Sequence, residues 1–134
     1  MTVAIIIDDE QHCIDRLRDL INEHAGNTLR LAGHFHTVEE GLAAIREIQP
    51  NLVFLDIHLK DKTGFDLLQQ IPSIHFDIIF TTAFDQYAIQ AFRFSALDYL
   101  LKPIDAGDFK MAIQKVTDKM SRNASAEKLE TLLH

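Results

Sequence analysis

The chain has 134 residues, of which 47% are hydrophobic and 25% charged, so we expect one globular domain with a substantial core. No hydrophobic run approaches the ~18 residues of a membrane helix, and the start "MTVAIII" lacks the basic segment of a signal peptide. The single cysteine, Cys13, excludes an internal disulfide framework and predicts a cytoplasmic protein, and the net charge of −7 argues against direct binding of nucleic acid.

Two patterns of hydrophobic residues alternate along the first half of the chain. Continuous β-rich runs such as "VAIII" predict strands buried on both faces, and apolar residues three or four positions apart predict helices. The residues Thr37 and Glu40 form a capping-box pattern. In chain order, the predicted elements are a strand at 3–7, a helix at 10–25, a strand at 29–35, a helix between Thr37 and Pro50, and a strand at 52–56.

The same alternation continues to Met120. The predicted elements are a helix at 64–71, a strand at 76–82, a helix at 85–94, a strand at 97–101 and a last helix capped by Asp105. Strands that alternate with helices of this length predict an α/β fold with a parallel sheet covered on both faces. After Met120 the composition becomes polar. We therefore expect a domain at 1–120 and a linker or tail at 121–134, leading towards a missing C-terminal output domain.

Acidic, hydroxyl and basic side chains gather where the predicted strands end. They are Asp8, Asp9 and Glu10 after the first strand, Asp56 at the end of the third, Thr81, Thr82 and Ala83 at the fourth, and Lys102 and Pro103 after the fifth. In parallel sheets, ligands bind outside the carboxyl ends of the strands. The sequence therefore predicts one small site that combines two or three carboxylates with a hydroxyl and an ammonium group.

These residue types together suit phosphoryl transfer. Clustered carboxylates repel one another unless a cation lies between them, and Mg²⁺ (or Mn²⁺) prefers oxygen ligands. One carboxylate can then attack phosphorus, while a lysine and a threonine hydroxyl suit the remaining oxygens of the acyl phosphate. We therefore expect metal-dependent transfer of a phosphoryl group to an aspartate.

Four motifs, "IIIDDE", "LVFLDIHL", "IIFTTAF" and "DYLLKPI", occur in order at the strand ends. Together, over residues 3–120, they resemble the receiver domain of two-component response regulators. The stretch "TTAFDQYAIQAFRFSALDYLLKPI" further resembles the LytTR (LytR/AlgR) subgroup, whose output domain binds DNA. The resemblance implies a (βα)5 flavodoxin-like, doubly wound sheet with strand order 2-1-3-4-5. It also implies a sensor histidine kinase as partner and a role in transcription regulation.

The resemblance implies a role for each matched residue. Asp56 is the phosphoacceptor, and the metal ligands are Asp8 (through water), Asp9, Asp56 and the backbone carbonyl of His58. The residues that contact the phosphoryl group or act in the switch are Thr82, Ala83, Tyr99 and Lys102, and the bond to Pro103 is cis. Two positions that tune the lifetime of the acyl phosphate hold His58 and Phe84. Because Phe84 cannot position a water by hydrogen bonding, we expect slow hydrolysis.

The predicted fourth helix, "DQYAIQAFRF", has apolar residues around most of its circumference, whereas a surface helix needs only one apolar stripe. The resemblance implies that this face, with the fifth strand and the fifth helix, controls dimerisation. We therefore expect an isologous homodimer through Tyr87, Ala88, Ala91 and Phe92. The alternative is a small helix that packs deeply into the core.

Three other functions fit the same fold class. A haloacid-dehalogenase-like phosphatase needs a second acid two residues after its nucleophile, where this chain has His58. A flavin carrier needs a phosphate-binding loop after the first strand, where "DDEQH" would repel a phosphate. A docking module that is never phosphorylated is less consistent with the complete set of Asp9, Asp56, Thr82 and Lys102.

Cys13 lies early in the first predicted helix and has two interpretations. It is either a redox thiol near the helix N-terminus or, as we favour, a small packing residue.

Overall fold

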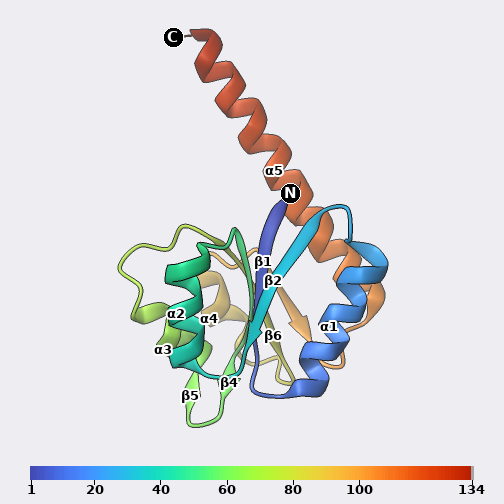
Figure 1. The fold of residues 1–134 in the computed structure, drawn as a ribbon, viewed down its shortest axis with the longest axis vertical. Helices are drawn as coiled ribbons and strands as arrows, with labels where there is room; N and C mark the ends of the chain where they lie inside the picture. Colours follow the sequence, from blue (N-terminus) through green and yellow to red (C-terminus); the bar gives the residue numbers. More distant parts are fainter. Residues whose placement is uncertain (134) are drawn as a thin grey trace.

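The computed structural model describes residues 1–133 and shows an open sheet with helices on both faces (Figure 1). The elements are β1 (Thr2–Ile7), α1 (Gln11–His24), β2 (Leu29–Phe35), α2 (Val38–Ile48), β3 (Leu52–Asp56), β4 (His58–Leu59), β5 (Lys62–Thr63), α3 (Gly64–Gln69), β6 (Asp77–Thr82), α4 (Ala88–Arg93), β7 (Asp98–Leu101) and α5 (Ala106–Leu133). The main sheet is parallel with strand order β2-β1-β3-β6-β7. This confirms the predicted α/β architecture and strand order.

The sheet separates two hydrophobic layers, because successive strand residues point to opposite faces. On one face, Ala4 and Ile6 of β1 pack with residues of α1 and α5. On the other face, Ile5 and Ile7 pack with residues of α2, α3 and α4. Figure 1 shows these two groups of helices on either side of the sheet. Strands covered on both faces explain why the runs that form them are continuously apolar.

The first residues of α3 pack against the backbone of Asp56 at the end of β3. Thr63 accepts a hydrogen bond from the backbone N–H of Asp66 at 3.1 Å, and the Asp66 side chain accepts one from the N–H of Thr63 at 2.9 Å. A Cβ atom on Gly64 would lie 2.5 Å from the carbonyl oxygen of Asp56. Only glycine lets α3 begin this close to the end of β3.

Three features differ from the sequence predictions. The hairpin of β4 and β5 was not predicted. The helix α4 is shorter than residues 85–94, and Ser95 after it has a left-handed backbone with φ of 58°. The helix α5 does not end near Met120 but continues to Leu133, projecting away from the sheet (Figure 1). Residues 121–133 are exposed and therefore do not pack against the core.

No helix within residues 1–133 combines the length and the hydrophobicity that crossing a membrane requires.

Candidate functional site

Four adjacent strands deliver their carboxyl-terminal residues to one edge of the sheet. Asp8 follows β1, Asp56 ends β3, Thr82 ends β6 and Lys102 follows β7. Asp8, Asp56 and Thr82 are buried, with exposed fractions of 0%, 3% and 1%. The polar side chains that the strand-end pattern predicted to converge therefore lie together at this end of the sheet.

The ammonium group of Lys102 lies between two carboxylates. Its Nζ is 2.9 Å from Oδ2 of Asp8 and 3.2 Å from Oδ2 of Asp56. Burial lowers the pKa of Lys102, but the hydrogen bond and the charges of the two aspartates outweigh this effect and raise it. The lysine is therefore held charged. Its peptide bond to Pro103 is cis, as predicted.

One ammonium group does not neutralise the acids around it. Burial and the nearby charge of Asp8 raise the pKa of Asp56 to about 7, although Lys102 and the backbone N–H of His58 favour the ionised form. That N–H donates to Oδ1 of Asp56 at 3.3 Å. The Asp56 carboxylate is thus only partly ionised at neutral pH unless a further cation approaches.

The carboxylates of Asp8, Asp9, Glu10 and Asp56 each offer an oxygen within 4.8 Å of the others. Oδ2 of Asp8 is buried, and the Lys102 ammonium lies 2.9 Å from it. Oδ2 of Asp9 accepts a hydrogen bond from the backbone N–H of Lys60 at 3.2 Å. A cluster made only of oxygen donors, with excess negative charge, fits a small hard divalent cation.

The Thr82 hydroxyl is hydrogen-bonded to the loop after β6. Its Oγ1 accepts a hydrogen bond from the backbone N–H of Phe84 at 3.2 Å, and the exposed residue Ala83 lies between them. The hydroxyl of Tyr99, in β7, donates a hydrogen bond to the carbonyl oxygen of Phe84. The neighbouring residue Thr81 has a buried hydroxyl with no hydrogen-bond partner within residues 1–133. Thr82 and Tyr99 are therefore joined through one loop residue.

Three aromatic residues meet at the rim of the site, and sequence reasoning did not foresee their contact. The ring centroid of His58 lies 5.1 Å from that of Phe84 and 5.2 Å from that of Tyr87, in edge-to-face arrangements. Only the assignment of His58 and Phe84 to the same role hinted that they would be close. The two positions predicted to tune acyl-phosphate lifetime are therefore in direct contact.

The predicted dimer face is only partly exposed. Ala91 is 1% exposed and packs in the core, so the prediction that it belongs to this face is wrong. Tyr87 and Ala88 are half-buried, and Phe92 is 73% exposed. Ile89, which the prediction omitted, is 75% exposed. The short helix turns its small residue inward and its two large hydrophobic residues outward.

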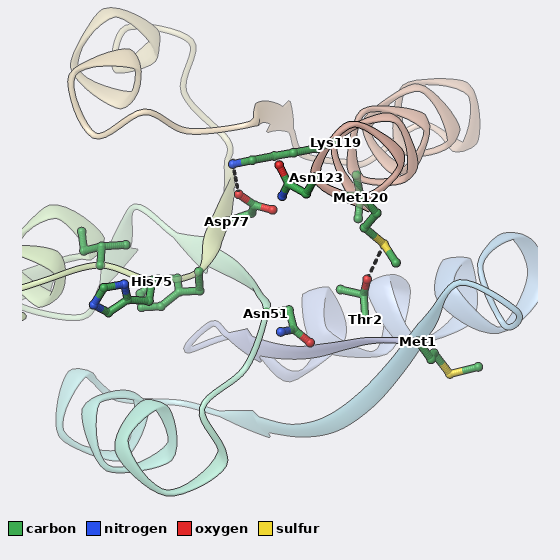
Figure 2. A pocket seen from close by; sticks show the side chains of 11 residues that line it. Met1, Thr2, Asn51, His75, Asp77, Lys119, Met120 and Asn123 are labelled. Atoms are coloured by element: carbon green, nitrogen blue, oxygen red, sulfur yellow. Dashed lines mark hydrogen bonds and ion pairs between the residues drawn. The ribbon is translucent and has the colours of Figure 1, made fainter. Parts of the chain in front are cut away.

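A hollow of about 550 Å³ lies at the opposite end of the sheet (Figure 2). Its walls include Thr2, Asn51 and Asp77, at the amino ends of β1, β3 and β6, together with α5. Lys119 of α5 forms an ion pair with Asp77, which joins the helix to the sheet. This hollow is separate from the acidic cluster at the carboxyl ends of the strands.

Residues 4–114 match the response regulator receiver domain family. The chain is 36% identical over 133 residues to an uncharacterised response regulatory protein of Vibrio parahaemolyticus, covering 98% of this chain and 54% of that protein. It is 34% identical over 121 residues to the sensory transduction protein LytT of Enterococcus faecalis, covering 89% of this chain and 49% of LytT. The chain thus spans about half the length of these curated relatives.

A solved structure has the same fold. The response regulatory domain of protein mrkE from Klebsiella pneumoniae superposes with a TM-score of 0.80 at 30% identity, covering 90% of this chain and 98% of that domain.

Proposed function

The chain belongs to the response regulator receiver domain family, and from this premise we propose that Asp56 accepts a phosphoryl group from a sensor histidine kinase. One observation carries the proposal. The Asp56 carboxylate, at the end of β3, lies 3.2 Å from the Lys102 ammonium and within 4.8 Å of three further carboxylates. This arrangement supplies a nucleophile, a positive charge for phosphoryl oxygens and a site for a divalent cation.

In the proposed reaction, a carboxylate oxygen of Asp56 attacks the phosphorus atom of a phosphohistidine in the kinase. A new P–O bond forms, the P–N bond breaks, and the leaving imidazole nitrogen keeps the electron pair and takes a proton from solvent. The Lys102 ammonium, already placed beside Asp56, stabilises the charge on the phosphoryl oxygens. The product is an acyl phosphate on Asp56, and the cycle ends when water hydrolyses it.

We propose that Asp8, Asp9, Asp56 and the backbone carbonyl of His58 hold Mg²⁺ during this reaction. The all-oxygen cluster and the burial of Asp8 and Asp56 within it support this assignment. When bound, Mg²⁺ supplies positive charge that favours the ionised form of Asp56 and screens the incoming phosphoryl oxygens. The protein residues orient the carboxylate: the His58 N–H and the Lys102 ammonium each contact a different Asp56 oxygen.

Phosphorylation would act on the rest of the domain through Thr82. A phosphoryl group adds about −1.5 to −2 charges and three strong acceptor oxygens. If the Thr82 hydroxyl turns towards these oxygens, it leaves the Phe84 N–H to which it is now bonded. The Phe84 carbonyl is bonded to Tyr99, so the rearrangement reaches β7 and the adjacent surface of α4. The free energy for this shift is the differential affinity of the phosphoryl group for the two states.

The proposed outcome is an isologous homodimer through α4, β7 and α5, with Phe92 and Ile89 as its exposed hydrophobic residues. We further propose that residues 121–133 lead into a LytTR-type DNA-binding domain that regulates transcription in the cytoplasm. The similarity to LytT supports this output domain. With a net charge of −7, the receiver residues themselves are poorly suited to contact DNA.

The experiment that tests the proposal is mass spectrometry after incubation with Mg²⁺ and a small acyl-phosphate donor. We expect one phosphoryl adduct that maps to Asp56 and is absent in Asp56→Asn and in the presence of a chelator. A folded protein that binds Mg²⁺ and forms no adduct would contradict the proposal. That result would favour the alternative of a docking module that works without phosphorylation.

A further inference from the structure

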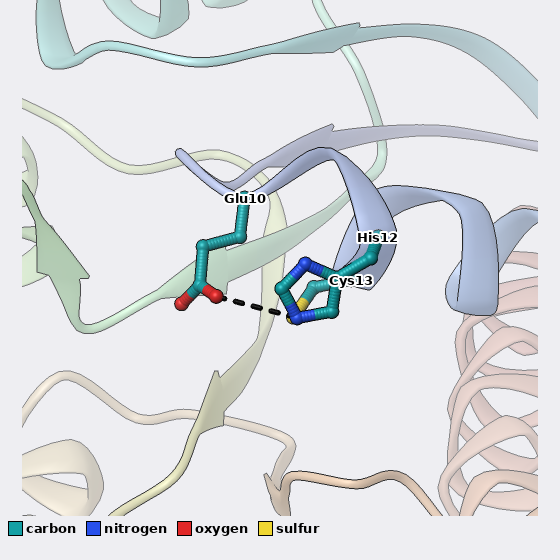
Figure 3. A group of neighbouring side chains, drawn as sticks. All are labelled: Glu10, His12 and Cys13. Atoms are coloured by element: carbon teal, nitrogen blue, oxygen red, sulfur yellow. Dashed lines mark ion pairs between the residues drawn. The ribbon is translucent and has the colours of Figure 1, made fainter.

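Three different metal-ligand types meet at the first turn of α1, next to the acidic cluster, with which they share Glu10. Glu10, His12 and Cys13 each offer one ligand atom, and these atoms lie within 4.8 Å of one another (Figure 3). Nε2 of His12 is 3.3 Å from Oε2 of Glu10. Glu10 is the N-cap residue of α1 and has an extended backbone, which lets its side chain turn back over the first turn.

The spacing agrees with the edge of a tetrahedral zinc site. Zn–N, Zn–O and Zn–S bonds of about 2.0 to 2.3 Å place neighbouring ligand atoms about 3.3 to 3.6 Å apart. The observed separation of nitrogen and oxygen already has this value. The side chains of His12 and Glu10 are 79% and 51% exposed, so small rotations can bring both onto the half-buried Cys13 sulfur. Such rotations on a surface displace no packed neighbours.

The donor set differs in kind from that of the acidic cluster. Thiolate and imidazole ligands favour borderline and soft cations such as Zn²⁺ and Co²⁺, whereas Mg²⁺ favours oxygen atoms. We infer that Glu10, His12 and Cys13 form a second metal site, which binds a cation of the zinc type through one oxygen, one nitrogen and one sulfur. Three protein ligands leave the fourth tetrahedral position to water.

The surroundings of this second metal site allow a cation to approach. The three residues line a hollow of about 330 Å³ whose walls also contain Arg16 and Lys102. Both positive side chains have other partners, although Lys102 also lies close to the Cys13 thiol. Arg16 donates two hydrogen bonds to the carbonyl oxygen of Ile104, and Lys102 is paired with two aspartates. Their charges are therefore partly compensated before a metal ion enters.

The test is a titration of the whole chain with Co²⁺ under reducing conditions, in excess Mg²⁺ to occupy the oxygen cluster. Cys13 is the only cysteine, so a thiolate-to-cobalt charge-transfer band in the near ultraviolet can come only from this residue. We expect the band to appear with one equivalent of Co²⁺, to disappear when Zn²⁺ displaces it, and to be absent in Cys13→Ser. We expect His12→Gln to weaken Co²⁺ binding at least about tenfold.

A matched control lies at the other end of the same helix. His24 and Glu23 form an exposed pair with 3.5 Å between Nε2 and Oε2, but no cysteine accompanies them. We expect His24→Gln to leave the band and the affinity unchanged. Binding without a charge-transfer band, or binding lost only in Asp9→Asn, would place the ion in the oxygen cluster and overturn the inference. A band that His12→Gln leaves at full strength and affinity would also overturn it, because the thiol alone would then hold the ion.

Discussion

The hydroxyl of Tyr99 donates a hydrogen bond to the backbone carbonyl of Phe84, with 2.5 Å between the two oxygens. The backbone N–H of Phe84 donates a hydrogen bond to Oγ1 of Thr82 at 3.2 Å. Phe84 is thus bonded on one side to the residue proposed to contact the phosphoryl group and on the other to the proposed aromatic switch. A change at either end alters the constraints on this loop.

Removing the hydroxyl in Tyr99→Phe should loosen the loop after β6. We expect a loss of about 1 kcal/mol in the free energy of unfolding, because one hydrogen bond at a partly exposed position is lost. We also expect faster hydrogen exchange of the Phe84 amide, measured by NMR. Tyr87→Phe is the control, since the Tyr87 hydroxyl makes no hydrogen bond within residues 1–133. Equal effects in the two variants would show that the bond to Phe84 is not the cause.

Asp56→Asn should stabilise the metal-free protein at alkaline pH. The folded-state pKa of Asp56 is about 7, well above its ordinary value of 3.8. A raised folded pKa adds stability below about pH 4, and this contribution is lost as pH rises to about 7. Asparagine does not titrate, so the free energy of unfolding of the variant does not fall with pH in this way. We expect it to exceed wild type by up to a few kcal/mol at pH 8, with the difference closing towards pH 4.

Urea denaturation in a chelator at several pH values measures this difference. Asp15→Asn is a suitable control, because the Asp15 side chain is 57% exposed and lies outside the acidic cluster. A stability gain in Asp56→Asn that is the same at pH 5 and pH 8 would show that repulsion within the site is not its source.

The sequence was sufficient to predict the site because its position follows from topology. Strands that alternate with helices must be parallel, and parallel strands bring their carboxyl ends together. Asp8, Asp56, Thr82 and Lys102 therefore converge without any knowledge of side-chain packing. The buried strands were equally predictable, since a strand covered on both faces is a continuous apolar run.

The remaining features depend on contacts between distant parts of the chain. Which hydrophobic residues of α4 face inward depends on how that short helix sits on the sheet, so the burial of Ala91 was missed. The contact between His58 and Phe84 joins loops that follow different strands. The strands β4 and β5 have two residues each, too few to show a periodic pattern.

Binding of Mg²⁺ should weaken as pH falls below about 7. Protons compete with the metal for Asp56, whose pKa is about 7 without a cation. We expect the apparent affinity to fall by up to about tenfold per pH unit in this range. Isothermal titration calorimetry at pH 5.5, 6.5 and 7.5 measures it. In Asp56→Asn the affinity should be lower and nearly constant over the same range, and a slope like that of wild type would assign the proton to another group.

Replacing the two exposed hydrophobic residues of α4 should weaken the phosphorylated dimer. Ile89 and Phe92 are 75% and 73% exposed, so Ile89→Ser with Phe92→Ser removes little buried surface from the monomer. We expect dimer affinity to fall at least about tenfold, while the free energy of unfolding changes by less than about 0.5 kcal/mol. Sedimentation of the phosphorylated protein measures the first quantity. Leu132→Ser with Leu133→Ser, at the far end of α5, should leave the dimer intact, and the opposite pattern would move the interface from α4 to the last turn of α5.

The acyl phosphate on Asp56 should hydrolyse slowly, and Phe84→Glu should accelerate its decay severalfold. Phe84 is 48% exposed and packs edge-to-face on His58, and its side chain offers no hydrogen bond to a water molecule. A glutamate carboxylate at this position can accept a hydrogen bond from an attacking water and orient it. Loss of the phosphoryl mass with time measures the decay.

Two further variants serve as controls. Phe84→Leu removes the ring without adding an acceptor, and its acyl phosphate should decay like that of wild type. Phe84→Gln adds an acceptor without charge, and its decay rate should fall between those of wild type and Phe84→Glu. If Phe84→Leu decays as fast as Phe84→Glu, the ring acts by covering the site, and the missing acceptor is not what slows hydrolysis.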